Sequence, residues 1–214
     1  LFGILVLIQA FTVLVGRLFS FDTWQAVIKF GAESDSRRDV EGLRAVSTFA
    51  LLFDLASALA AGAFGLLVLL LFGERLGLPA PHAAAAAIYV GSLFVQLPGA
   101  PVGLMRLFDK FNWLTAITIA EAAARLAASA ILFALGSPLA AYLYAFGAIL
   151  IAANLVRLAA SLQLLRVATG RLVPASRAEI RKVARRFTRF SIGAWLTGTL
   201  NVTRREGTTL AVAA

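Results

Sequence analysis

Long apolar blocks alternate with short charged connections along this 214-residue chain. A helix that crosses a bilayer needs roughly 20 predominantly apolar residues, and most of the blocks reach that length. The pattern therefore predicts an all-α, polytopic transmembrane helix bundle with about six spans. The predicted apolar segments cover residues 1–15, 46–72, 83–105, 113–135 and 139–165, and a last one that begins near Phe187.

Composition agrees with the hydropathy pattern and excludes several kinds of site. Hydrophobic residues make up 60% of the chain and charged residues 14%, whereas soluble domains have about 45–50% and about 25%. The chain has no cysteine, and its single histidine, His82, falls in a predicted loop. Disulfides, thiolate metal sites and a histidine metal site are therefore excluded, and we expect neither a metal nor a cofactor.

The net charge of +9 is distributed very unevenly between the connections. Five Lys or Arg residues follow the first apolar segment, two follow the third and eight follow the fifth, whereas Arg75 alone follows the second or fourth. Positively charged loops stay in the cytoplasm. The excess charge therefore reflects topology, with the basic loops cytoplasmic, and we expect no nucleic-acid partner.

The longest basic connection, SRAEIRKVARRFTRF, has apolar residues at helical spacing and fills its other face with Lys and Arg. A basic amphipathic helix of this kind typically lies on the anionic inner leaflet. It could also link two halves of a transporter. The chain starts without methionine and both its ends lie in apolar runs, so we expect it to be a piece of a longer protein.

Five polar residues lie inside the predicted spans, where an ionisable group costs about 2.5 kcal/mol or more and normally faces a bundle interior or a wet cavity. Glu121 and Arg125 are four residues apart and can form a structural pair, or Arg125 can meet an anionic substrate. Arg157, three residues after Asn154, can snorkel to the interface or bind a phosphate. Asp54 can pair with a basic residue of another helix or bind a coupling ion.

The third apolar segment contains three residues that disturb a helix, Pro98, Gly99 and Pro101. Proline removes backbone hydrogen bonds and kinks a helix. Broken helices are common in transporters, although static kinks are equally common. The sequence has no phosphate-binding glycine loop, nucleophile elbow or metal-spaced carboxylates, so a transporter is favoured over an enzyme.

Several stretches, in this order, resemble a known family. They are RLFSFDTWQAVIKFGAE, LLFDLASALAAGAFGLLV, PGAPVGLMRLFDKFNWL and FSIGAWLTGTLNVTRREGTTLAV. Together they are similar to the bacterial oligosaccharide flippases, which are the lipopolysaccharide and polysaccharide biosynthesis membrane proteins of the multidrug/oligosaccharidyl-lipid/polysaccharide exporter superfamily.

The resemblance implies a two-bundle fold in the bacterial inner membrane that moves polyprenyl-pyrophosphate-linked oligosaccharide from the cytoplasmic to the outer leaflet. By this resemblance, residues 1–170 would form the first bundle without its first helix. Residues 171–189 would be the cytoplasmic linker, and residues 190–214 would start the second bundle. The implied partners are membrane lipid, the lipid-linked glycan and other polysaccharide-assembly membrane proteins.

A diphosphate head group needs a wet, cationic cavity, and the planar fork of arginine suits phosphate. Arg125 and Arg157 are the buried candidates for binding it, and Arg17 and Lys29 are candidates at the cytoplasmic mouth. Interfacial anchoring is the alternative for each residue.

Three rival functions remain open. A cation-coupled multidrug antiporter of the same superfamily would need acidic groups in its cavity. A glycan polymerase or ligase would need a large periplasmic loop, and the outward loops are short. A scaffold that transports nothing would need none of the buried charges.

Overall fold

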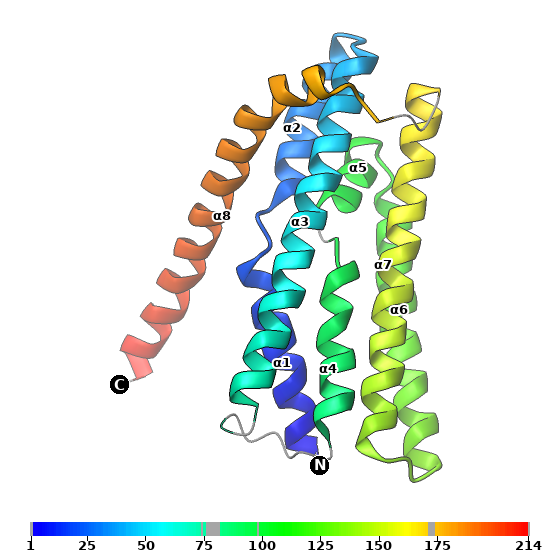
Figure 1. Cartoon of the computed structure of the whole chain (residues 1–214), viewed down its shortest axis with the longest axis vertical. Helices are drawn as coiled ribbons and strands as arrows, with labels where there is room; N and C mark the ends of the chain where they lie inside the picture. Colours follow the sequence, from blue (N-terminus) through cyan, green and yellow to red (C-terminus); the bar gives the residue numbers. More distant parts are fainter. Residues whose placement is uncertain (1, 74, 76–81, 98, 171–173, 214) are drawn as a thin grey trace.

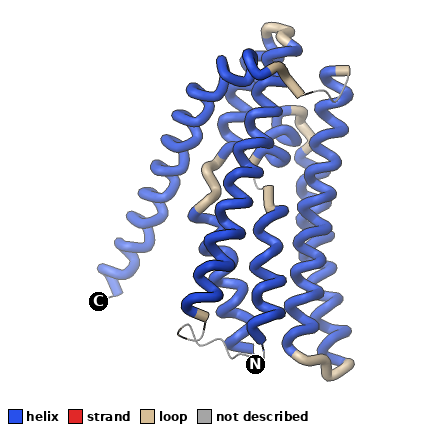
Figure 2. Tube along the Cα trace, viewed as in Figure 1, coloured by secondary structure: helices blue, strands red, loops and turns tan. Residues whose placement is uncertain are grey.

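The computed structural model describes residues 2–73, 75, 82–97, 99–170 and 174–213, with side chains described from residue 3 to residue 197. Helices account for nearly all of these residues, and none of them forms a strand (Figure 2). The all-α prediction is confirmed. The helices are α1 (Phe2–Leu18), α2 (Thr23–Ser36), α3 (Val40–Phe72), α4 (Ala83–Gly91), η2 (Ser92–Val95), α5 (Ala100–Leu107), α6 (Phe111–Ala134), α7 (Leu139–Thr169) and α8 (Arg177–Ala213).

Most of the helices run roughly along one direction, and α8 leans away from the rest (Figure 1). Four helical segments of the described chain are long and apolar enough to cross a membrane: Gly3–Ser36, Val40–Phe72, Phe111–Ala134 and Leu139–Thr169. The bent pair Ala83–Val95 and Ala100–Leu107, whose axes differ by 43°, would make a fifth. The chain is therefore a multi-pass membrane protein.

The sixth apolar segment of the sequence corresponds to α8, which is not among these candidate spans. The first half of α8 carries six basic residues, and its sequence then interleaves Gly and Thr with apolar residues before Arg204 and Arg205. Helix α8 is therefore long enough to cross a membrane, but its composition is too polar for it to count as a candidate span.

The polar stretch after the first apolar segment is itself helical. The chain leaves α1 at Leu18, passes through Asp22 in a left-handed conformation (φ 49°) and starts α2 at Thr23. Helix α2 packs against α3 and α5. A Cβ at Gly103 of α5 would lie 3.0 Å from Trp24 Cα, so glycine there permits the close approach that packs helices in membranes.

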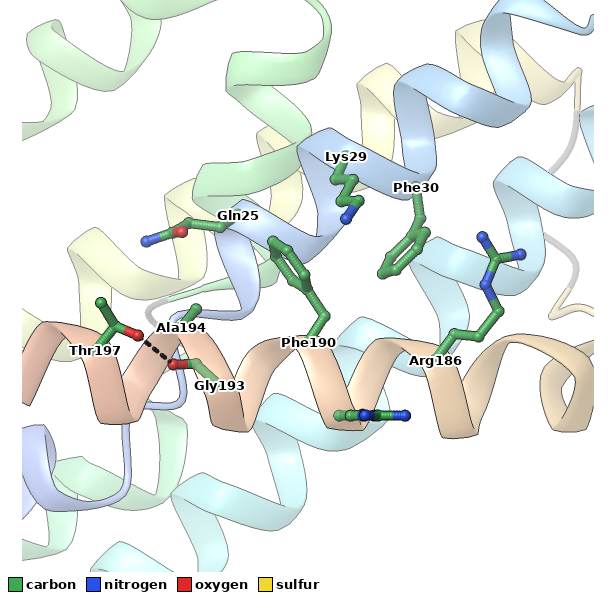
Figure 3. Close-up of a pocket in the computed structure, with 9 residues that line it drawn as sticks. Gln25, Lys29, Phe30, Arg186, Phe190, Gly193, Ala194 and Thr197 are labelled. Carbon is green, nitrogen blue, oxygen red and sulfur yellow. Dashed lines mark hydrogen bonds between the residues drawn. The ribbon is translucent and has the colours of Figure 1, made fainter.

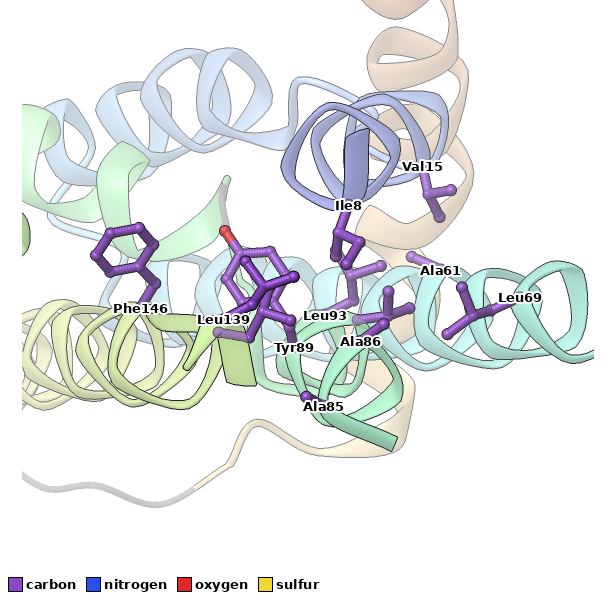
Figure 4. Packing of buried hydrophobic residues seen from close by; sticks show 12 residues of the cluster. Ile8, Val15, Ala61, Leu69, Ala85, Ala86, Tyr89, Leu93, Leu139 and Phe146 are labelled. Atoms are coloured by element: carbon purple, nitrogen blue, oxygen red, sulfur yellow. The ribbon is translucent and has the colours of Figure 1, made fainter. Parts of the chain in front are cut away.

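Two buried apolar clusters hold the helices together. The first joins α1, α3, α4 and α7, and Figure 4 shows Ile8 and Val15 above Tyr89 and Leu93. The second joins α2, α3, α5 and α8. Its described core members are Ala26, Val27, Phe30, Val46, Ala50, Ala100, Leu104 and Phe187.

Helix α8 begins as the amphipathic pattern predicts, and part of its apolar face packs against the helix bundle. Ser176 Oγ accepts a hydrogen bond from Glu179 N (3.3 Å) at the start of the helix. Phe187 is 0% exposed, with its ring centroid 5.3 Å from that of Phe49. The basic residues of these first turns face outward. Helix α8 continues unbroken past residue 189.

Candidate functional site

An open cavity of about 440 Å³, with polar and aliphatic side chains in its wall, lies among α1, the α4–α5 break, α5, α6 and α7. Three arginines, Arg17, Arg106 and Arg157, line it, and no acidic residue is among its described lining residues. The other polar residues that line it are Ser20, Gln96, Thr118 and Asn154. The structure thus brings two of the predicted binding residues, Arg17 and Arg157, to one cavity.

Arg157 reaches this cavity from α7 and is held by polar partners. Its Nη2 donates to Glu121 Oε2 at 2.6 Å, and its Nη1 donates to Asn154 Oδ1 at 3.5 Å. Asn154 in turn donates to the Leu150 carbonyl (3.0 Å). The Arg157 side chain is 14% exposed. These contacts hold its guanidinium at the wall of the cavity.

Glu121 is shared between two arginines of neighbouring helices. Its Oε1 accepts a bond from Arg125 Nη2 (2.9 Å), which is the predicted pair within α6. The second bond, from Arg157, joins α6 to α7. One carboxylate therefore faces two guanidinium groups, which leaves this cluster with a net positive charge. Arg125 itself is not among the residues that line the cavity.

Arg106 belongs to the cavity although the sequence marks it only as a loop charge. It lies in the last turn of α5, and its Cζ is 4.3 Å from the centroid of the Trp24 ring, a cation–π contact. Its Nε is buried without a hydrogen-bond partner in the described structure. The sequence offered one signal for this residue, because Arg106 closely follows the predicted helix break at Pro98, Gly99 and Pro101.

Neither Arg17 nor Arg106 forms an ion pair with any carboxylate of the described residues. A buried guanidinium nitrogen without a partner is costly. An anion that entered the cavity would supply the missing acceptor.

Asp54 is buried, with 3% of its surface exposed, and accepts three hydrogen bonds. The donors are Thr23 Oγ1 (2.5 Å), Gly99 N (2.9 Å) and Ala100 N (2.5 Å). The expected basic partner on another helix is absent among the described residues. The carboxylate instead satisfies free amides at the start of α5, as a helix cap does. Asp54 therefore fixes the short helix that carries Arg106.

Two of the three predicted kink residues lie at this same helix start. Gly99 precedes α5, and a Cβ there would overlap Thr23 Oγ1. Pro101 lies in the first turn of α5, where an amide hydrogen is not needed. Pro98 lies outside the described residues.

Lys29 lies apart from the arginine cavity, because it faces α8 from α2. Its Nζ is 4.4 Å from the centroid of the Phe190 ring, and it lines a separate pocket (Figure 3). The four predicted binding residues are thus divided. Arg17 and Arg157 line the arginine cavity, Arg125 bonds to Glu121 without lining it, and Lys29 lines the pocket between α2 and α8. No group of three His, Cys, Asp or Glu residues suited to a metal occurs in the described part of the chain.

One curated protein is similar to part of this chain. Inner membrane protein YghQ of Escherichia coli (strain K12) is 28% identical over 112 residues, which are 52% of this chain and 32% of that protein. The matched region thus spans about a third of that relative's length. No protein-family model matches the chain, and no solved structure matches it.

Proposed function

We propose that this chain is part of a membrane transporter that flips polyprenyl-pyrophosphate-linked oligosaccharide from the cytoplasmic to the outer leaflet of a bacterial inner membrane. The observation that carries the proposal is the cavity lined by Arg17, Arg106 and Arg157 and, among its described lining residues, by no acid. The family resemblance of the sequence and the name of the E. coli relative support a location in the inner membrane.

The chemistry of the cavity suits a diphosphate. Arginine makes paired, charge-assisted hydrogen bonds to phosphate oxygens. Two of the three guanidinium groups have no carboxylate partner in the described structure. The volume of about 440 Å³ is within the range of about 300–1,000 Å³ of small-molecule sites. We assign the cavity to the diphosphate end of the substrate, with the glycan extending beyond it.

The proposal favours the flippase over a multidrug antiporter. An antiporter that moves cationic drugs needs acidic groups free to meet them. Asp54 is bonded by Thr23 and two amides, and Glu121 by two arginines. We propose transport of this substrate without covalent chemistry, and delivery of the lipid-linked glycan to other polysaccharide-assembly proteins of the same membrane.

The test uses the complete reading frame in a strain that lacks the gene. The strain is complemented with wild type, Arg106→Ala or Arg157→Ala, and the lipid-linked oligosaccharide of the inner leaflet is measured with the protein level. We expect it to build up in the deletion strain. Each alanine variant should lower flux about tenfold or more, because one charge-assisted phosphate contact is lost. Arg166→Ala, which changes an exposed arginine of the same helix α7, is the matched control.

Normal flux in both Arg106→Ala and Arg157→Ala would contradict the assignment of the cavity. Sensitivity to cationic drugs without build-up of the glycan would identify the antiporter instead. Rescue of flux by every variant, including one that carries all the changes, would indicate a scaffold.

A further inference from the structure

A second cationic pocket, of about 830 Å³, lies between α2 and α8. It shares no lining residue with the arginine cavity. Residues of α2 form one wall and residues of α8 form the other (Figure 3). The pocket is open on the side where α8 leans away from the other helices (Figure 1).

The charges of this pocket have one sign. Lys29 of α2 and Arg186 and Arg189 of α8 line it, and its described lining residues include no acid. Arg186 Nη2 approaches Glu33 Oε2 at 3.4 Å, whereas Lys29 and Arg189 have no ion pair with a carboxylate of the described residues. A negatively charged group would therefore meet at least two cations that no carboxylate neutralises.

Aromatic rings lie beneath these charges. Lys29 and Phe190 point toward one another across the gap (Figure 3), with 4.4 Å between Nζ and the ring centroid. Arg186 Cζ lies 5.3 Å from the centroid of the Phe30 ring. The pocket thus presents cations at its rim and apolar surface in its wall, which is the polarity of a phospholipid at the boundary between head group and acyl chain.

Two of the α8 residues that line the pocket are small. Gly193 and Ala194 line the pocket, and a Cβ added at Gly193 would meet no atom within 4 Å. Position 193 therefore has room for a Cβ atom at the wall of the pocket. This position offers a way to block the pocket and leave its charges unchanged.

We propose that the α2–α8 pocket binds the phosphate-bearing head group of an anionic phospholipid, with Lys29 and Arg189 as its principal contacts and Phe30 and Phe190 against the glycerol and upper acyl region. Basic pockets between helices recognise acidic lipids through this chemistry. The bound lipid would bridge α2 and α8 and hold the leaning helix against the bundle. The proposal does not rest on the transported substrate.

The experiment measures which lipid the complete protein retains. The protein is purified and incorporated into bilayer discs that contain equal amounts of phosphatidylglycerol and phosphatidylcholine, and retained lipid is counted by native mass spectrometry. We expect wild type to retain phosphatidylglycerol preferentially. The double variant Lys29→Ala/Arg189→Ala and the blocking variant Gly193→Leu should each reduce that preference about fivefold or more. Arg181→Ala removes another exposed charge of α8 that does not line the pocket, and it should change nothing.

Three results would overturn the proposal. One is equal retention of the two lipids by wild type. Another is a loss in Arg181→Ala as large as that in the double variant, which would mean that the basic face of α8 attracts lipid without a defined site. The third is an unchanged preference for phosphatidylglycerol in Gly193→Leu. This variant keeps the proposal testable even if the double variant does not insert into the discs.

Discussion

At the scale of single residues, Glu121 holds two cations with one carboxylate. It bonds to Arg125 (2.9 Å) and Arg157 (2.6 Å). The Glu121 side chain is 15% exposed, so water screens these charge interactions little. The carboxylate stabilises two helices against each other and also partly neutralises Arg157. An anionic substrate and Glu121 would therefore compete for the same guanidinium.

We predict that Glu121→Gln destabilises the protein and increases its response to an anion. Loss of the charged acceptor should lower the free energy of unfolding by about 2 kcal/mol. Pyrophosphate should then raise the thermal midpoint more in the variant than in wild type, because it replaces the missing charge. Thermal unfolding in detergent, with and without millimolar pyrophosphate, measures both effects.

The matched control is Glu179→Gln, which removes the partner of Lys182 in an exposed pair of α8. Such pairs contribute about 0–1 kcal/mol, so this change should be close to silent. An equal pyrophosphate shift in wild type and Glu121→Gln would show that Arg157 is not freed by the substitution.

Asp54 and Thr23 act together at the start of α5. Asp54→Asn places an amide NH₂ where three donors now converge, so it should lower the free energy of unfolding by about 2 kcal/mol or more. Thr23→Val removes one donor at constant shape and should cost about 1 kcal/mol. A double-mutant cycle of unfolding free energies measures their coupling. Ser57→Ala, one turn further along α3, removes a hydroxyl that bonds only within its helix and is the control.

At the scale of elements, the buried ring of Phe187 packs α8 against the bundle. Phe187 is among the largest fully buried side chains of the described chain, and it contacts Phe30, Phe49 and Phe53. The basic residues of α8 keep the opposite face outward. The direction of the helix is therefore set by packing against α2 and α3 rather than by its charge pattern.

We predict that Phe187→Ala loosens α8 and leaves α6 and α7 intact. Deletion of a buried phenyl ring costs about 3–5 kcal/mol, which here falls on the docking of one helix. Hydrogen exchange of the amides in the first five turns of α8 should become faster, with unchanged exchange in α6 and α7. Ile192→Ala, at a side chain that is 40% exposed, should leave all three helices unchanged. Uniform acceleration in all three helices would mean that the whole bundle depends on this ring.

At the scale of the whole molecule, the connections between helices lie at two opposite ends of the bundle. Figure 1 places the α2–α3 turn, the last turn of α7 and the start of α8 at one end and the α6–α7 turn at the other. The basic residues of the sequence concentrate in the connections of the first end. This arrangement is the one that the charge asymmetry predicts for a chain with its basic loops on a single side.

We predict that Ser36→Cys and Ser176→Cys react with a membrane-impermeant thiol reagent only from the cytoplasmic side, and Ser137→Cys only from the opposite side. The chain has no cysteine, so each variant carries a single thiol. Labelling of intact cells against inverted membrane vesicles measures the orientation, with the unsubstituted protein as the blank. Labelling of Ser36→Cys and Ser137→Cys from the same side would contradict the assigned topology.

The sequence by itself determined the class of this protein. Apolar length selects helices that cross a bilayer, because no other element satisfies its backbone within lipid. The uneven distribution of Lys and Arg predicted one common side for the basic loops. The pairing of Glu121 with Arg125 was also readable, because residues four apart on a helix are neighbours. Each of these properties depends on composition or on contacts within a few residues.

Only the tertiary structure decided which polar residues meet. The bond of Arg157 to Glu121 joins residues 36 apart in the chain, and that of Asp54 to the amide of Ala100 joins residues 46 apart. The packing of helices brought Arg106 into the cavity, separated Lys29 from it and buried Phe187. No local pattern encodes these contacts, because an apolar helix shows in its sequence how long it is but not which neighbour each of its faces touches.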